Sequence, residues 1–74
     1  MIKNILITGA NGQDGKIILQ KLSKRKVNLI LLDKKFEKKI RKKNIKYFEF
    51  NLKNKRKIKK LFKSFNIDTI LNLA

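Results

Sequence analysis

The sequence predicts an α/β fold, a doubly wound parallel sheet with strand order 3-2-1-4. Short apolar runs of strand length alternate with segments whose apolar residues recur at helical spacing. All three glycines of the chain fall in one seven-residue window, residues 9–15, between the first apolar run and the first helical segment. Alternating strands and helices favour a parallel sheet covered on both faces. Right-handed crossovers then limit the strand order.

The first half of the chain predicts a strand, a helix and a second strand. Residues 2–8 form a short β-branched run that ends at a glycine, which is typical of a buried strand. From Gly15 onward the apolar positions follow the i, i+3, i+4, i+7 pattern of one helix face, and this helix is expected to fade near residues 23–26. Its apolar residues are Ile18, Leu19 and Leu22. Residues 27–33, VNLILLD, predict a second strand that ends on a carboxylate.

The second half begins with a charge-dense connection, residues 34–44. Phe36 and Ile40 lie four apart within it, which favours one short helical turn. Residues 45–52, IKYFEFNL, alternate between two sides and predict the third strand.

A second long helix and a final strand complete the pattern. Asn54 is of a residue type that caps helices, and it precedes the helical segment. The apolar face of this helix is expected to comprise Ile58, Leu61, Phe62 and Phe65. Residues 69–74, TILNLA, predict the fourth strand.

Composition limits the classes of function. Seventy-four residues make at most one small domain, residues 1–74, and a chain of this size buries only about 60% of its unfolded surface. The lack of cysteine and histidine excludes disulfides, thiol catalysis and the usual zinc and copper ligands, so no metal site is expected. No apolar stretch approaches the ~20 residues of a membrane helix, and the N-terminus lacks the apolar core of a signal peptide. We therefore expect a cytoplasmic protein without a membrane partner.

The net charge of +16 permits a polyanion as partner. However, Lys outnumbers Arg 18 to 3, whereas specific nucleic-acid recognition relies on the bidentate contacts of Arg. We interpret the charge mainly as compositional bias and expect no specific binding of nucleic acid. The alternative that stays open is a small basic α/β module, which binds nucleic acid or another polyanion through the lysines of residues 34–43 and 53–63.

The glycines suit a phosphate-binding turn between a strand and a helix. Gly9 can form the tight turn at the end of the strand. Gly12 has no Cβ, so a pyrophosphate can approach the backbone there, and Gly15 lets the helix pack closely on the sheet. A plain tight turn without a ligand is the competing interpretation.

The residues between the glycines fit the same interpretation. The N–H groups at the helix start, around Gln13 and Asp14, would face the anion, and Asn11 tolerates a left-handed conformation well. A P-loop is excluded, because five residues separate the outer glycines and Ile17 stands where the magnesium-binding hydroxyl would be.

Asp33 provides a second, independent indication. It closes the second predicted strand, 18 residues after Gly15. An acid at this place can accept hydrogen bonds from both hydroxyls of an adenosine ribose. The competing interpretation is a solvated carboxylate beside Lys34 and Lys35. The strand–turn–helix–strand context favours a Rossmann-like dinucleotide site.

These segments together resemble a known family. ITGANGQDG, LILLD, FNLKN and IDTILNLA, in this order, resemble the N-terminal part of the extended short-chain dehydrogenases/reductases, the NAD-dependent epimerases and dehydratases of nucleotide sugars. The resemblance spans essentially the whole chain, and the T-G-x-x-G-x-x-G spacing is that of the extended branch. The tetrad GQDG is also similar to GDP-mannose 4,6-dehydratases, without fixing a substrate.

The resemblance implies a role for each matching residue. The three glycines would form the pyrophosphate turn, Asp33 would hold the adenosine ribose, and the cofactor would be NAD, or NADP if Lys34 or Lys35 turned toward a 2′-phosphate. Asn51 and Leu52 match the family's Asp-Leu at the adenine edge, with an uncharged amide in place of the carboxylate. Strand-four residues beneath the cofactor would be Leu73 and Ala74.

The family's catalytic pair, Tyr-x-x-x-Lys, has no match in the chain. The single tyrosine, Tyr47, is followed four positions later by Asn51, and we interpret it as a packing residue. No catalytic residue is therefore assigned, and catalysis by this segment alone is not expected. The resemblance implies the cofactor-binding beginning of a longer, homo-oligomeric oxidoreductase that acts on a nucleotide sugar.

Overall fold

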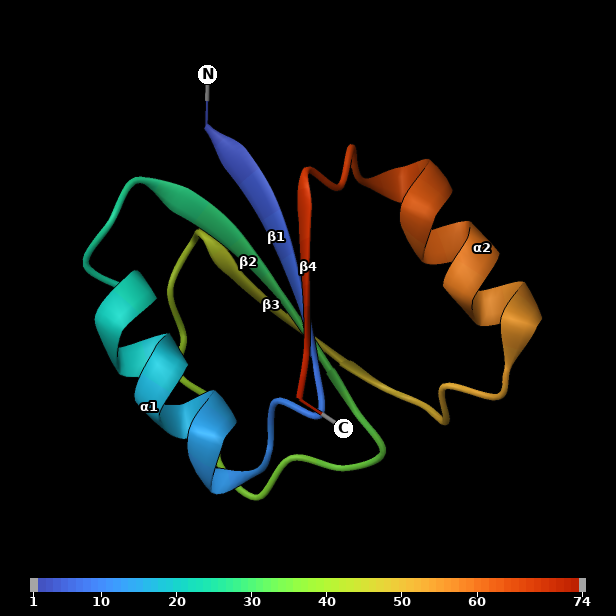
Figure 1. Ribbon diagram of the computed structural model, residues 1–74, viewed down its shortest axis with the longest axis horizontal. Coiled ribbons are helices and arrows are strands. Elements are labelled where there is room, and N and C mark those ends of the chain that lie inside the picture. The colour runs from blue at the N-terminus through green and yellow to red at the C-terminus, as the bar shows by residue number, and fades with distance from the viewer. Residues whose placement is uncertain (1, 74) are drawn as a thin grey trace.

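The computed structural model describes residues 2–73. They form four strands and two helices in the order strand–helix–strand–strand–helix–strand (Figure 1). The elements are β1 (Lys3–Thr8), α1 (Gln13–Leu22), β2 (Val27–Asp33), β3 (Ile45–Glu49), α2 (Lys55–Ser64) and β4 (Thr69–Asn72). Neither helix in this range has the length and apolar character required to cross a membrane.

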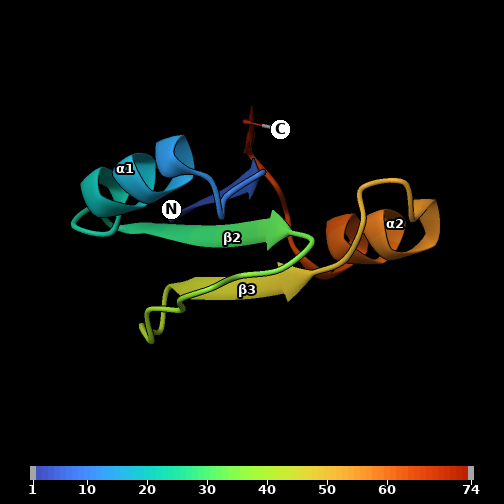
Figure 2. The same ribbon diagram turned by 90° about the horizontal axis from the view of Figure 1, so that it is seen from below.

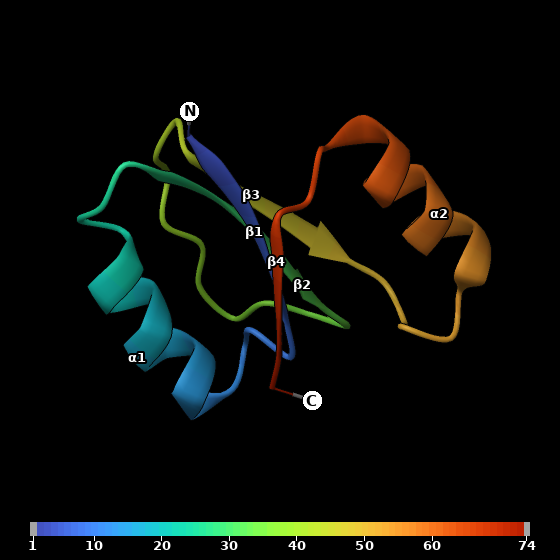
Figure 3. The same ribbon diagram turned by 45° about the horizontal axis from the view of Figure 1, so that its top comes forward.

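All strand pairs are parallel, and the order in the sheet is β3-β2-β1-β4. The α/β class and the strand order predicted from the sequence are thus confirmed. The helices lie on opposite sides of the sheet (Figures 1 and 3). β2 and β3 run in the same direction and are joined by a long excursion rather than a helix (Figure 2).

Alternation along the strands divides the apolar side chains between the two faces of the sheet. Ile5, Ile7, Leu29 and Leu31 pack with α1, which contributes Ile18, Leu19 and Leu22. Leu6, Ile30 and Leu32 pack with α2, which contributes Ile58 and Leu61. Since β1 and β2 are buried on both faces, they are continuous apolar runs rather than alternating ones.

The second helix follows the expectation at its start and departs from it at one residue. The Asn54 side chain accepts a hydrogen bond from the Lys57 N–H at 3.2 Å and caps α2 as predicted. Phe62, expected on the core face, is 41% exposed. α2 has only one fully buried residue, Leu61, because only a narrow stripe of this short helix touches the sheet.

The expected helical turn around Phe36 and Ile40 is wrong. Residues 34–44 contain no helix. Phe36 is buried against the α1-side core, whereas Ile40 is 47% exposed. The two side chains therefore do not form one apolar helix face, although their spacing matches that of a helix.

Strand ends differ by a few residues from the predicted ones. The third strand ends at Glu49 instead of residue 52, and the fourth ends at Asn72. Leu73 still donates its N–H to the Thr8 carbonyl at 2.9 Å and prolongs the parallel pairing. Ala74 lies outside the described residues.

The turn from β1 into α1 depends on two of the three glycines. Gly9 has φ +70°, a left-handed conformation that L side chains rarely adopt. A Cβ on Gly15 would lie 2.2 Å from the carbonyl oxygen of Ala10. Close packing at Gly15 was predicted against the sheet, and the closest contact is instead with the backbone of the turn at Ala10.

We predict that Gly15→Ala destabilises the fold by about 1–3 kcal/mol, the usual cost of overpacking, although alanine favours a helix by about 1 kcal/mol. Gly12→Ala is the matched control, because its Cβ would meet only the Gly9 carbonyl oxygen, at 3.5 Å. Urea unfolding of both variants measures the difference. Equal stability of Gly15→Ala and wild type would show that the turn can move aside.

Candidate functional site

The loop between β1 and α1 is anchored to the end of β2. The Leu32 carbonyl accepts hydrogen bonds from the N–H groups of Gly9 at 2.9 Å and Ala10 at 3.3 Å. These bonds continue the pairing of Thr8 with Leu32 in the sheet register. As a result, the glycine turn and Asp33 lie side by side at the carboxyl edge of the sheet, where ligands bind in open α/β sheets.

Gly12 is the N-cap of α1, and no side chain caps this end of the helix. The N–H groups of the first helical turn, which include those of Gln13 and Asp14, lack intrahelical partners and are available to an anion. Gly12 has φ −70° and ψ 172°, an extended conformation open to any residue, and a Cβ there would meet only an ordinary contact. The chain itself does not require glycine at this position.

The Asp33 carboxylate binds the turn as well as its own strand end. Its Oδ2 accepts from the Asn11 N–H at 2.9 Å, and its Oδ1 accepts from the Lys34 N–H at 2.7 Å. A carboxylate offers about four acceptor sites, so two remain for further donors such as ribose hydroxyls. The Lys34 side chain is exposed.

A pocket of about 120 Å³ lies beside this carboxylate. It brings together five predicted site residues from three separate stretches of the chain. Its lining comprises Gly9, Leu32, Asp33, Lys34, Phe50, Asn51 and Leu52. Sequence reasoning missed Leu32 and Phe50; their positions directly before Asp33 and Asn51 were the available signal.

The Asn51 side chain is partly engaged within the chain. Its Oδ1 accepts from the Lys53 N–H at 3.0 Å, and its carbonyl accepts from Asn54 at 2.9 Å. This turn holds residues 51–54 between β3 and α2. A second lone pair on the amide oxygen remains for a donor in the pocket.

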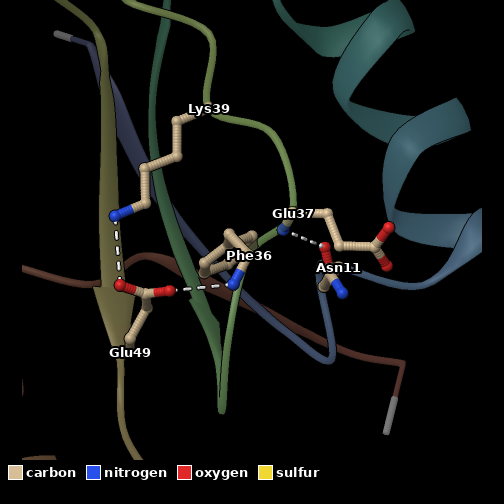
Figure 4. A network of polar contacts seen from close by, with 5 residues as sticks. All are labelled: Asn11, Phe36, Glu37, Lys39 and Glu49. Carbon is tan, nitrogen blue, oxygen red and sulfur yellow. Dashed lines mark hydrogen bonds and ion pairs between the residues drawn. The ribbon is translucent and has the colours of Figure 1, made fainter.

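Asn11 has a role that the sequence did not reveal. Within residues 2–73, no residue other than glycine has positive φ, so the expected left-handed conformation at Asn11 is wrong. Instead, the Asn11 side-chain oxygen accepts from the Glu37 N–H at 3.2 Å (Figure 4). Asn11 thus connects the glycine turn to the β2–β3 connection.

Glu49 anchors the same connection from β3. Its Oε2 accepts from the Phe36 N–H at 2.9 Å, and its Oε1 lies 3.1 Å from the Lys39 ammonium (Figure 4). The Phe36 hydrogen bond and the contact with Lys39 lower the pKa of Glu49. Both contacts join residues ten or more positions apart and leave no pattern in the sequence.

Tyr47 is partly buried and packs against the core on the α1 side, in agreement with its interpretation as a packing residue. Its ring meets Phe36 edge-on, with centroids 4.8 Å apart. Its hydroxyl oxygen also accepts from the Ile40 N–H at 2.8 Å.

Comparison with known proteins identifies the family. A family model described as the NAD dependent epimerase/dehydratase family matches residues 5–74. The chain therefore belongs to this family. A search among curated proteins found no match.

Solved structures agree in fold. UDP-glucose 4-epimerase from Thermotoga maritima is 23% identical with a TM-score of 0.81, over 96% of this chain and 24% of that one. A second UDP-glucose 4-epimerase is 21% identical with a TM-score of 0.80, over 97% and 22%. An epimerase from Methanothermobacter thermautotrophicus is 26% identical with a TM-score of 0.84, over 99% and 23%. The chain thus spans about a quarter of the length of each of these structures.

The lowered pKa of Glu49 predicts a pH-dependent contribution to stability. The Glu49 contacts stabilise the fold above the ordinary glutamate pKa of about 4.3, and this contribution disappears as the pH falls through the lower folded-state value. Wild type should therefore exceed Glu49→Gln in melting temperature at about pH 6, and this gap should narrow below about pH 4. If the difference in melting temperature between the two proteins stayed constant across this pH range, the lowered pKa would not belong to Glu49.

Proposed function

We propose that the chain binds NAD through the glycine turn and the pocket beside Asp33, as the cofactor-binding segment of an epimerase- or dehydratase-like oxidoreductase. The nucleotide sugar would be bound only by a longer protein of which residues 1–74 are the N-terminal portion. Membership of an NAD-dependent family supports the cofactor, and similarity to two UDP-glucose 4-epimerases supports this class of substrate.

The observation that carries the proposal is the difference between Gly12 and the other two glycines. Contacts within the chain account for Gly9 and Gly15, but not for Gly12. Helix capping alone would favour Ser, Asp or Asn at this N-cap position. Close approach of a pyrophosphate to the backbone supplies the missing reason.

Gly12→Val tests the proposed turn. The side chain would occupy the space of the pyrophosphate, so NAD binding should be lost, while helical content stays nearly unchanged. Isothermal titration calorimetry and circular dichroism measure the two effects. Equal NAD affinity of wild type and variant would contradict the assignment.

The salt dependence of binding separates this function from the polyanion module. NAD binding through the turn should survive moderate salt and depend on Gly12. Polyanion binding through the lysines of residues 34–43 and 53–63 should be independent of Gly12 and should weaken steeply as salt rises. Lys59→Gln with Lys60→Gln is the matched control, since both lysines are exposed on α2 and line no part of the pocket beside Asp33.

We predict tighter binding of NAD than of NADP. A charge-assisted hydrogen bond from the ribose to Asp33 is worth roughly 1.5–3 kcal/mol, and the same carboxylate would repel a 2′-phosphate. Lys34 and Lys35 oppose this preference. In Asp33→Asn the preference for NAD over NADP, measured as the ratio of the NADP to the NAD dissociation constant, should fall by roughly tenfold or more. Tighter binding of NADP by the wild type would overturn the prediction.

A further inference from the structure

We propose that Glu49 is a positioning residue for the dinucleotide site, which it supports through the β2–β3 connection. This inference rests on the proposed function. Glu49 lines no part of the pocket beside Asp33, so any effect on the ligand must pass through the residues that it holds.

Glu49 holds the β2–β3 connection through both of its carboxylate oxygens. One carboxylate oxygen accepts the Phe36 N–H and the other meets the Lys39 ammonium, so the two oxygens hold residues three apart (Figure 4). Tyr47, two residues earlier on β3, accepts the Ile40 N–H. Residues 34–44 have no regular secondary structure, so their backbone conformation depends on such tethers.

The β2–β3 connection is in turn hydrogen-bonded to the glycine turn. Glu37 follows Phe36 directly, and its N–H is donated to the side chain of Asn11 in the glycine turn. The Asn11 N–H is in turn donated to Asp33. The tether of Phe36 to Glu49 thus fixes the backbone that supports Asn11, and Asn11 fixes the orientation of the proposed ribose acceptor.

Charge and positioning predict opposite effects at this residue. Removal of a carboxylate from a chain of net charge +16 favours an anionic ligand. If Glu49 acted only through its charge, Glu49→Ala would bind NAD more tightly. If it positions the turn, the variant binds NAD more weakly.

The test compares three variants for NAD affinity by calorimetry and for amide hydrogen exchange at Asn11 and Glu37. Glu49→Ala should weaken NAD binding by roughly tenfold, because the ligand must then order a turn that the tether no longer holds, and hydrogen exchange at both amides should be faster. Glu49→Gln should restore part of the affinity, because its amide oxygen can still accept from Phe36. Asn44→Ala is the control. It removes a 2.9 Å hydrogen bond of the same connection, from the Asn44 side chain to the Val27 carbonyl, at the amino end of β2 and therefore away from the proposed site.

Unchanged or tighter binding by Glu49→Ala would overturn the inference, as would an equal loss of affinity in Asn44→Ala. Failure of the wild type to bind any dinucleotide would refute the proposed function and, with it, the role of Glu49 toward a ligand. In that case the hydrogen-exchange rates still test whether Glu49 holds the glycine turn. Unchanged protection of the Asn11 amide in Glu49→Ala would show that Glu49 is not coupled to the turn.

Discussion

The pairing of β1 with β2 fixes the positions of the glycine turn and of Asp33 in the proposed site. Thr8 lies opposite Leu32 in the register, so the turn that follows Thr8 and the carboxylate that follows Leu32 emerge together. Both strands are apolar on both faces, so their burial holds them together at the centre of the sheet, and their parallel register determines which residues emerge at its carboxyl end. The burial of these two strands is therefore what brings the glycine turn to Asp33.

The sequence predicted the elements whose signal is local. An apolar run bounded by glycine located β1, an apolar run ending on a carboxylate located β2, and helical spacing located both helices. Burial of a strand on both faces leaves a continuous apolar run, and a helix against one face leaves a periodic stripe. The glycine turn and Asp33 were also recognisable, because the spacing between them follows from one strand, one turn and one helix.

Features that depend on distant contacts were not predictable. Phe36 and Ile40 show helical spacing, yet their connection is held by side chains of β3, and no local pattern records this. Asn11 was noted only for its tolerance of a left-handed backbone, but in the fold its N–H donates to Asp33 and its side-chain oxygen accepts from Glu37. In the sequence, Glu49 only falls on the same side of the predicted strand as Ile45 and Tyr47, and the fold is needed to place it against Phe36 and Lys39.

A dinucleotide bound at the carboxyl ends of β1 and β2 would change the backbone amide signals there, and a nitrogen–proton NMR titration with NAD measures this change residue by residue. The largest shifts should fall in residues 9–15, 33–34 and 51–52, with little change in α2. Shifts spread over the lysine-rich residues 55–63, without change in the glycine turn, would contradict this site and favour a polyanion-binding surface.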